Sequence, residues 1–122
     1  INKICFLETN GSKYQDIYDA FHDEFYMVRC TVPSFGDESG EMSVPGINKS
    51  TSIRILLEHL KGDIANTYAI GDGMNDAEML DCVNTGIAMG NAKEGLKAIA
   101  DYITTNLMED GIYNAFKHFG LI

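Results

Sequence analysis

The sequence has few basic residues, few cysteines and no long apolar run, and each shortage excludes a class of protein. Lys and Arg number 9 against 18 Asp and Glu, a formal net charge of −9, which argues against nucleic acid or an anionic membrane as a partner. The three cysteines, Cys5, Cys30 and Cys82, are an odd number in apolar runs, so we expect buried free thiols and a cytoplasmic protein. No apolar run approaches about 18 residues, so the sequence predicts no membrane-spanning helix.

Two further shortages concern metal ligands and the start of the chain. The histidines, His22, His59 and His118, are too scattered for a metal-ligand spacing, and we expect them on the surface or at helix flanks. The chain opens on Ile1 rather than on Met, inside a stretch that is typical of a strand. We therefore expect a fragment of a longer protein, although 122 residues are enough for one core.

The most informative stretch is an apolar run that leads into a pair of acids between glycines and then into a helix. Thr67–Ile70 predicts a short buried strand. Gly71 and Gly73 predict a tight turn with positive φ. Asn75 followed by Glu78 predicts a capping box at the start of the helix.

Asp72 and Asp76 lie four residues apart around this turn. Because open α/β sheets bind ligands at the carboxyl ends of their strands, we expect both carboxylates and the Asn75 amide to converge there. Such an all-oxygen set suits Mg²⁺, above all when the ion is shared with a phosphate. Ordinary acidic helix caps are the alternative, since the helix dipole favours them. An EF-hand and a dinucleotide-binding loop are excluded, because Ala77 and Asp76 stand where these motifs need glycine.

Residues 1–45 predict a strand, a helix and two more strands, in that order. The helix is expected to begin with a capping box of Ser12 and Gln15. The strands are expected over 1–7, 26–32 and 41–44. A β-α-β-β unit of this size is too small to be independent, so we expect it to extend a sheet whose other strands lie upstream.

Residues 46–122 predict alternating helices and strands, which is the pattern of a parallel sheet covered by helices on both faces. The first helix has Lys49 at or just before its first turn, where the helix dipole disfavours a cation. From its position alone, Lys49 is equally consistent with a functional residue and with an ordinary surface lysine.

Helix ends and core positions follow from the same patterns. Gly62 and Gly120 are expected to end the first and last of these helices, and Asn91 with Glu94 predicts another capping box. Helical spacing places one set of apolar side chains toward the core. They are Ile53, Leu56, Leu57, Leu60, Ala77, Leu80, Val83, Leu96, Ile99, Ala100, Ile112, Ala115, Phe116 and Phe119.

Five segments of the second part occur in the order of a known family. They are Gly46–Ser50, Gly71–Asp76 with Met79-Leu80, Gly86–Ala92, Ala100–Thr104 and Glu109–Gly111. In these segments the sequence resembles the C-terminal half of a haloacid dehalogenase (HAD) superfamily phosphatase of the Cof type. The resemblance implies that residues 1–45 are the C-terminal part of an α+β cap domain and that residues 46–122 are the second half of a HAD-like, Rossmann-type core.

The resemblance also implies a Mg²⁺-dependent phosphatase that hydrolyses small phosphorylated metabolites such as sugar phosphates. In this family an Asp nucleophile forms an aspartyl phosphate, a second Asp serves as general acid and base, and Mg²⁺ stabilises the transferring charge. By carry-over, Asp72 would bind Mg²⁺, and Asp76 would bind it directly or through water. Lys49 would contact the phosphoryl oxygens and the nucleophile, and Asn75 would hold the phosphate or order the loop.

The sequence departs from the family because the N-terminal nucleophile motif, Asp-x-Asp-Gly-Thr, is absent. The nearest stretch has Glu8 in place of the nucleophile and Asn10 in place of the acid, and Asn cannot transfer a proton. We therefore expect an inactive fragment that binds Mg²⁺ weakly or not at all. Two alternatives stay open: a natural short chain that binds a phosphorylated ligand or a partner without turnover, and a half-domain whose sheet is completed by self-association or by another chain.

Overall fold

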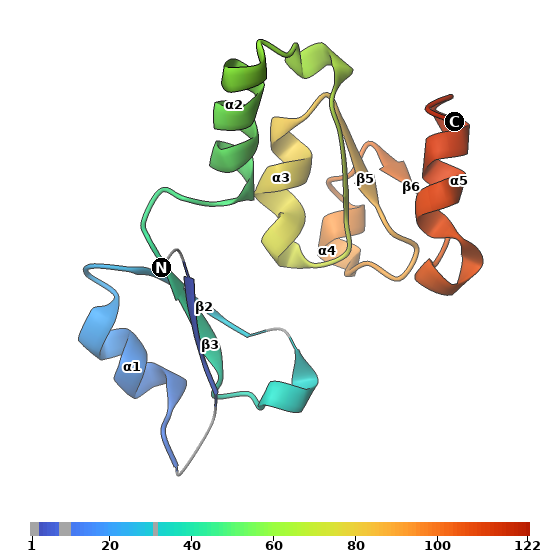
Figure 1. The fold of residues 1–122 in the computed structure, drawn as a ribbon. Helices are drawn as coiled ribbons and strands as arrows, with labels where there is room; N and C mark the ends of the chain where they lie inside the picture. Colours follow the sequence, from blue (N-terminus) through green and yellow to red (C-terminus); the bar gives the residue numbers. More distant parts are fainter. Residues whose placement is uncertain (1–2, 8–10, 31) are drawn as a thin grey trace. The chain divides into compact units, whose positions relative to one another are not determined.

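The computed structural model describes residues 3–7, 11–30 and 32–122. The chain divides into two units, Ile1–Ile47 and Asn48–Ile122, and Figure 1 traces both. The division falls next to Pro45-Gly46, where Gly46 has a φ of 76°. Each unit combines strands with helices, so the predicted α/β class is confirmed.

The first unit is a three-stranded antiparallel sheet with one helix against it. Its strands are β1 (Lys3–Phe6), β2 (Tyr26–Arg29) and β3 (Gly40–Ser43), in the spatial order β1-β3-β2. Helix α1 spans Tyr14–Phe21, and a 3₁₀ turn, η1, spans Pro33–Phe35. The predicted β-α-β-β order is confirmed.

Tyr14 attaches α1 to this sheet. The residue is buried, and its ring stacks on Phe6 of β1 with the centroids 6.0 Å apart. The guanidinium carbon of Arg29 lies 4.3 Å from the Tyr14 ring centroid, within reach of a cation–π contact. Gly40 permits this packing, because a Cβ there would lie 2.8 Å from the Tyr14 ring.

The predicted capping box of Ser12 and Gln15 is wrong. Helix α1 begins at Tyr14, and within the described part of the chain its N-cap residue Lys13 makes no side-chain capping hydrogen bond. Tyr14 instead donates its backbone N–H to the Glu38 carboxylate at 2.7 Å. A residue 24 positions away thus satisfies the helix start, and a local pattern cannot indicate such a partner.

The second unit is a parallel sheet of three strands with helices around it. The strands are β4 (Tyr68–Gly71), β5 (Thr85–Ala88) and β6 (Tyr102–Ile103), in that spatial order. The helices are α2 (Lys49–Leu60), α3 (Ala77–Cys82), α4 (Glu94–Lys97) and α5 (Gly111–His118), and 3₁₀ turns are η2 (Ile64–Asn66), η3 (Met74–Asp76) and η4 (Leu107–Glu109). In the view of Figure 1 the strands lie between α3 and α5. The predicted parallel sheet is confirmed.

The core of the second unit contains side chains of β5, α3 and α4. Ile87 and Leu96 are 0% exposed and Leu80 is 2% exposed. Ala77, Val83 and Ala100 pack against the buried cluster as predicted. The rest of the cluster consists of three alanines, Ala69, Ala88 and Ala92, and of Met89.

Many predicted core positions on α2 and α5 are exposed instead. Helix α2, described throughout, contains no buried residue, and Leu56 and Leu60 are 55% and 65% exposed. On α5 Ile112 is 50% exposed, and Ile99 after α4 is 53% exposed. Among the described strands, β4 pairs with β5 alone, so its other edge is open. Helical spacing identifies which side chains share a face, but it does not say what covers that face.

Helix ends and caps differ from the prediction in detail. The left-handed residue after α2 is Lys61, with a φ of 54°, one position before the predicted Gly62. Gly120, with a φ of 67°, follows α5 as predicted. Asn91 does not cap α4, because the N-cap of that helix is Lys93. The Asn91 side chain accepts the backbone N–H of Leu107 at 3.0 Å and thus joins two loops.

Cysteine burial agrees with the prediction in part. Cys82 is buried, Cys30 is half-buried and Cys5 is exposed, so the expectation of a buried thiol is wrong for Cys5. That side chain lies on β1, in a sheet of three strands. The three histidines are exposed, as expected. No helix in the described ranges is long and apolar enough to cross a membrane.

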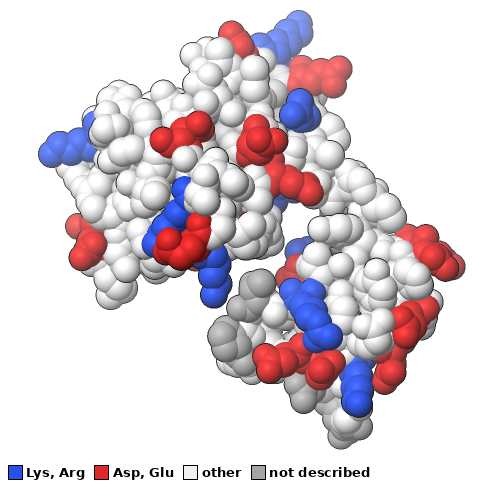
Figure 2. Space-filling model, turned by 180° about the vertical axis from the view of Figure 1, so that it is seen from behind, with Lys and Arg blue, Asp and Glu red and all other residues white. Residues whose placement is uncertain are grey.

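The charges on one face of the molecule are distributed rather than gathered. On the face drawn in Figure 2, Asp and Glu side chains lie interspersed with Lys and Arg over both units. With a net charge of −9, the overall field repels an anionic ligand. A phosphate site on this chain therefore needs a local cation.

Candidate functional site

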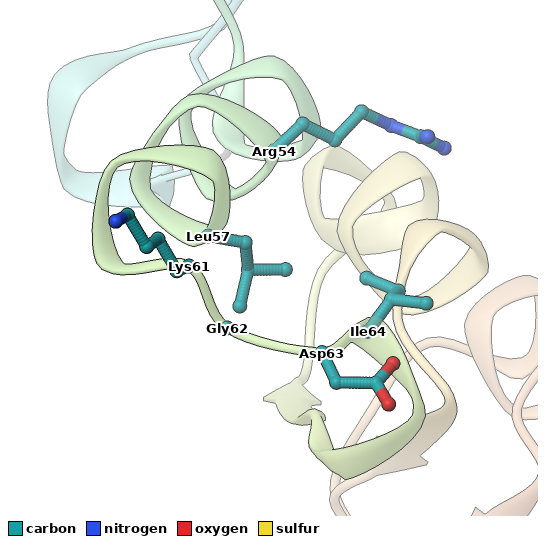
Figure 3. Close-up of a pocket in the computed structure, with 6 residues that line it drawn as sticks. All are labelled: Arg54, Leu57, Lys61, Gly62, Asp63 and Ile64. Carbon is teal, nitrogen blue, oxygen red and sulfur yellow. The ribbon is translucent and has the colours of Figure 1, made fainter.

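Among the described residues of the second unit, a cavity and an acidic turn are each open to a small molecule. The cavity, about 460 Å³, lies at the C-terminal end of α2 (Figure 3). It is lined by Arg54, Leu57, Lys61, Gly62, Asp63 and Ile64. At a rise of about 1.5 Å per residue, Lys61 lies roughly 18 Å along the helix from Lys49. The cavity is thus remote from the predicted site residues.

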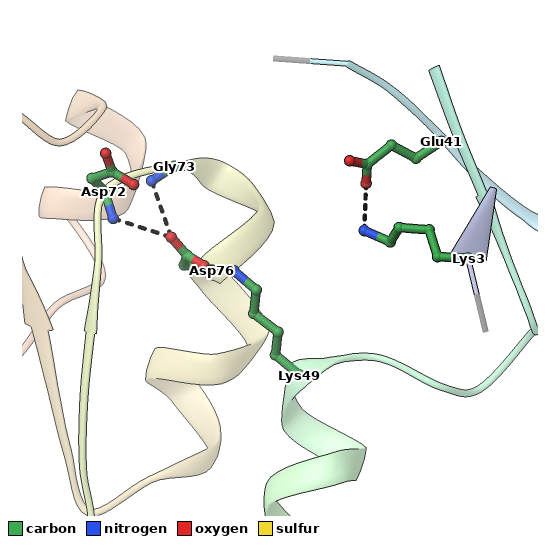
Figure 4. A network of polar contacts seen from close by, with 6 residues as sticks. All are labelled: Lys3, Glu41, Lys49, Asp72, Gly73 and Asp76. Atoms are coloured by element: carbon green, nitrogen blue, oxygen red, sulfur yellow. Dashed lines mark hydrogen bonds and ion pairs between the residues drawn. The ribbon is translucent and has the colours of Figure 1, made fainter. Parts of the chain in front are cut away.

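The candidate site is the turn that follows β4 (Figure 4). Asp72 comes directly after β4, and Asp76 ends η3 and precedes α3. Both lie at the carboxyl end of a parallel strand, which is where open α/β sheets bind ligands. Lys49 is the first residue of α2, and its side chain reaches this turn.

Asp76 is the buried centre of the site, being 5% exposed. Its Oδ2 accepts the backbone N–H groups of Asp72 at 3.1 Å and of Gly73 at 3.2 Å. Its Oδ1 accepts a hydrogen bond from the Lys49 ammonium, with which it forms an ion pair. The carboxylate therefore closes the turn and holds the lysine at the same time.

Opposing effects set the pKa of Asp76. Burial by itself raises the pKa of this carboxyl group, because it disfavours the charged form. The hydrogen bond from Lys49 and the backbone N–H donors of Gly73 and Asp72 outweigh burial and hold the pKa below its usual range. Asp76 is consequently a carboxylate at neutral pH. The Lys49 side chain is 51% exposed.

The glycines of the turn allow close approach, and the predicted positive φ is wrong. Gly73 has a φ of −110°, and Gly71 is not one of the described residues with positive φ. A Cβ on Gly71 would lie 2.6 Å from the Cβ of Asp76. The Asp76 side chain folds back against the end of β4, and this contact is what requires a glycine.

The predicted capping box of Asn75 and Glu78 is also wrong. The N-cap of α3 is Asp76, and Asp76 uses its carboxylate to accept the N–H of Gly73 at the start of η3. Glu78 accepts a hydrogen bond from the side chain of Asn48. Asn75 is exposed, and its amide oxygen lies next to Gly73.

Asn48 and Glu78 also belong to the site, because their side chains form a hydrogen bond. The sequence motifs did not predict this contact. Asn48 Oδ1 accepts the Thr51 N–H at 2.8 Å, and the Asn48 N–H donates to Thr51 Oγ1 at 3.0 Å. This reciprocal capping box starts α2 at Lys49. A signal was available, because Asn is a preferred N-cap residue in front of an apolar helical pattern.

The chemistry of the donors decides how well this chain fits Mg²⁺. Asp72 has an exposed side chain, and its carboxylate is a ligand type that Mg²⁺ prefers. Both oxygens of Asp76 already accept hydrogen bonds. In the described ranges no three His, Cys, Asp or Glu side chains gather at one point. These residues therefore fit part of a Mg²⁺ site and not a complete one. Glu8 and Asn10 lie outside the described residues.

Comparison with known proteins identifies the family of this chain. Residues 1–116 match a family described as haloacid dehalogenase-like hydrolase. The chain is 45% identical over 101 residues to the HMP-PP phosphatase of Escherichia coli, which covers 80% of this chain and 35% of that enzyme. The chain thus spans about a third of the length of this relative.

Solved structures share the fold over most of the chain. BT1666 from Bacteroides thetaiotaomicron, described among phosphatases of the HAD superfamily, has a TM-score of 0.80 and 27% identity, covering 99% of this chain and 42% of that one. BT4131, described as a HAD subclass IIB sugar phosphatase, has a TM-score of 0.73 and 33% identity, covering 88% and 39%. Here too the chain spans less than half of the longer molecule.

Proposed function

Since the chain belongs to the haloacid dehalogenase-like hydrolase family, we propose that it is the C-terminal part of a Mg²⁺-dependent phosphatase of the Cof type. Its substrates would be small phosphorylated metabolites such as sugar phosphates, in the cytoplasm. The observation that most supports this is the ion pair of Lys49 with the buried Asp76, beside the exposed Asp72 at the end of β4. In this proposal residues 1–45 end a cap domain, and residues 46–122 form the second half of the core.

Lys49 provides the attraction for a phosphoryl group. An ammonium has three N–H donors, of which one is directed to Asp76, so donors remain for an anionic oxygen. A charged donor to an anionic acceptor makes a strong hydrogen bond. This local cation offsets the repulsion of a phosphate by a chain of net charge −9.

The acids and Asn75 complete this half of the site. Asp76 remains ionised, holds Lys49 and closes the turn, while Asp72 offers its carboxylate to Mg²⁺. When bound, Mg²⁺ would neutralise charge on the transferring phosphoryl group. Asp76 would reach the ion through water, because both of its oxygens already accept hydrogen bonds. Asn75 would hold the phosphate or order the loop.

Phosphate release from p-nitrophenyl phosphate tests this proposal in the longer protein that contains these residues. With Mg²⁺ present that protein should be active, and Asp72→Ala should remove most of the activity. Asp81→Ala, an exposed acid on α3, is the matched control and should keep it. An unaffected Asp72→Ala variant would contradict the metal assignment. Phosphate binding without any release would favour the non-catalytic alternative.

Completion of the sheet by another polypeptide is a second candidate function. It is favoured by the open edge of β4 among the described strands and by Ile55, Leu56 and Leu60, each more than half exposed on α2. Open edges and apolar surfaces of this kind promote association. Analytical ultracentrifugation of the 122-residue chain should then show a dimer or larger species. A monodisperse monomer would count against self-association.

A further inference from the structure

Two neighbouring residues at the start of α2, the N-cap Asn48 and the first helical residue Lys49, form hydrogen bonds with the start of α3. Asn48 donates from its side-chain amide to the carboxylate of Glu78, and Lys49, the next residue, donates to Asp76. The two acceptors are also close in sequence, on either side of Ala77, the first residue of α3. Two neighbouring hydrogen bonds therefore connect the N-terminal ends of α2 and α3.

The position of the Lys49 ammonium depends on how the start of α2 is held. Helix α2 has no buried residue along its described length, so apolar packing restrains it weakly. The Lys49 side chain is 51% exposed and has a flexible four-carbon stem. A second restraint on the adjacent residue reduces the positions that the ammonium can reach.

Asn48 is suited to this restraint because its side-chain amide has both an acceptor oxygen and a donor nitrogen. The oxygen accepts the Thr51 N–H and caps α2, while the nitrogen donates to Glu78. Aspartate in the same place would keep the cap, but a carboxylate cannot donate a hydrogen bond and would repel Glu78. The capping role and the bridging role can therefore be separated by substitution.

We propose that Asn48 and Glu78 are a positioning pair, which holds the start of α2 against α3 and thereby keeps the Lys49 ammonium beside Asp76. Neither residue is assigned contact with the substrate. The proposal rests on the proposed function only where it assumes that Lys49 binds a phosphate. The arrangement of Asn48, Lys49, Asp76 and Glu78 stands without it.

Solvent exchange of the Lys49 ammonium protons, measured by NMR on the 122-residue chain, tests the pair. Glu78→Ala should speed this exchange by about two- to fivefold, in line with the net contribution of one intramolecular hydrogen bond. Glu78→Gln removes the same charge but keeps an acceptor oxygen, so it should exchange close to the unmodified rate. Asn48→Asp should behave like Glu78→Ala. Asp81→Ala on α3 is the control and should change nothing.

Equal exchange rates in Glu78→Ala and Glu78→Gln would overturn the proposal, because the hydrogen bond would then have no effect on Lys49. Faster exchange in Asn48→Asp alone would also overturn it, because Glu78 would then have no part in holding Lys49. Circular dichroism should show the same helix content in all four variants. Since the measurement needs no turnover, its failure is distinguishable from failure of the phosphatase proposal.

Discussion

The two units each contain a lysine paired with a carboxylate, and the two pairs differ in their surroundings (Figure 4). In the first unit Lys3 of β1 donates to Glu41 of β3 at 2.5 Å, and the side chains are 53% and 29% exposed. In the second unit Lys49 is 51% exposed, but the Asp76 side chain is 7% exposed. The lysines are nearly alike, so the difference lies in the acids.

The environment of the acid decides what each pair does. Asp76 also accepts two backbone N–H groups, so its removal leaves donors without partners in a buried place. The hydrogen bond to Glu41 raises the pKa of the Lys3 ammonium, but this pair joins two strands at a solvated surface. An ion pair thus indicates a candidate site when its acid is buried and also accepts hydrogen bonds from the backbone of its own turn.

The largest effect is expected from truncating the buried acid. Asp76→Ala should lower the free energy of unfolding by about 3 kcal/mol, because it leaves the N–H groups of Asp72 and Gly73 and the charge of Lys49 without an acceptor. Glu41→Ala, the corresponding change in the first unit, should cost less than about 1 kcal/mol. Urea unfolding monitored by circular dichroism measures both. Similar costs would remove the distinction between the two pairs.

A smaller effect is expected from crowding the buried acid. Gly71→Ala places a Cβ 2.6 Å from the Asp76 Cβ and should cost about 1–3 kcal/mol, since the Asp76 side chain has to shift. Gly73→Ala is the matched control: its Cβ would meet only the movable amide of Asn75, so the cost should be lower. If Gly73→Ala proves the more harmful, close approach to Asp76 is not the reason for Gly71.

Acidification should remove the stabilisation that Asp76 provides. Because the folded pKa of Asp76 is lowered from about 3.8, its contribution is present above the unfolded pKa and is lost as the pH falls through the folded pKa. The difference in melting temperature between the unmodified chain and Asp76→Asn should therefore shrink below about pH 4. A difference that stays constant down to pH 2 would contradict the lowered pKa.

The smallest effect is expected at the exposed Lys3–Glu41 pair, whose contribution to stability is lost only at alkaline pH. The folded pKa of Lys3 is raised above 10.5, so its contribution is complete below the unfolded pKa and is lost as the pH rises through the folded one. A double-mutant cycle of Lys3→Met and Glu41→Gln should give a coupling of about 0.2–1 kcal/mol at neutral pH, reduced by salt. A coupling that salt does not change would indicate a less solvated pair.

The features that could be predicted depend on local periodicity. The β-α-β-β order, the alternating pattern after residue 46, and the acids at the end of β4 each follow from residues that are near in sequence. The start of α2 at Lys49 is equally local, since Asn48 and Thr51 are three residues apart. Hydrophobic spacing and turn chemistry act over such distances.

Tertiary structure alone decided the contacts and the burial. Lys49 meets Asp76 across 27 positions, Asn48 meets Glu78 across 30, and Glu38 satisfies the start of α1 across 24. Leu56 and Leu60 have the spacing of core residues and are nevertheless exposed. Spacing along a chain specifies which side chains share a face, whereas desolvation and hydrogen-bond partners depend on what the fold brings against that face.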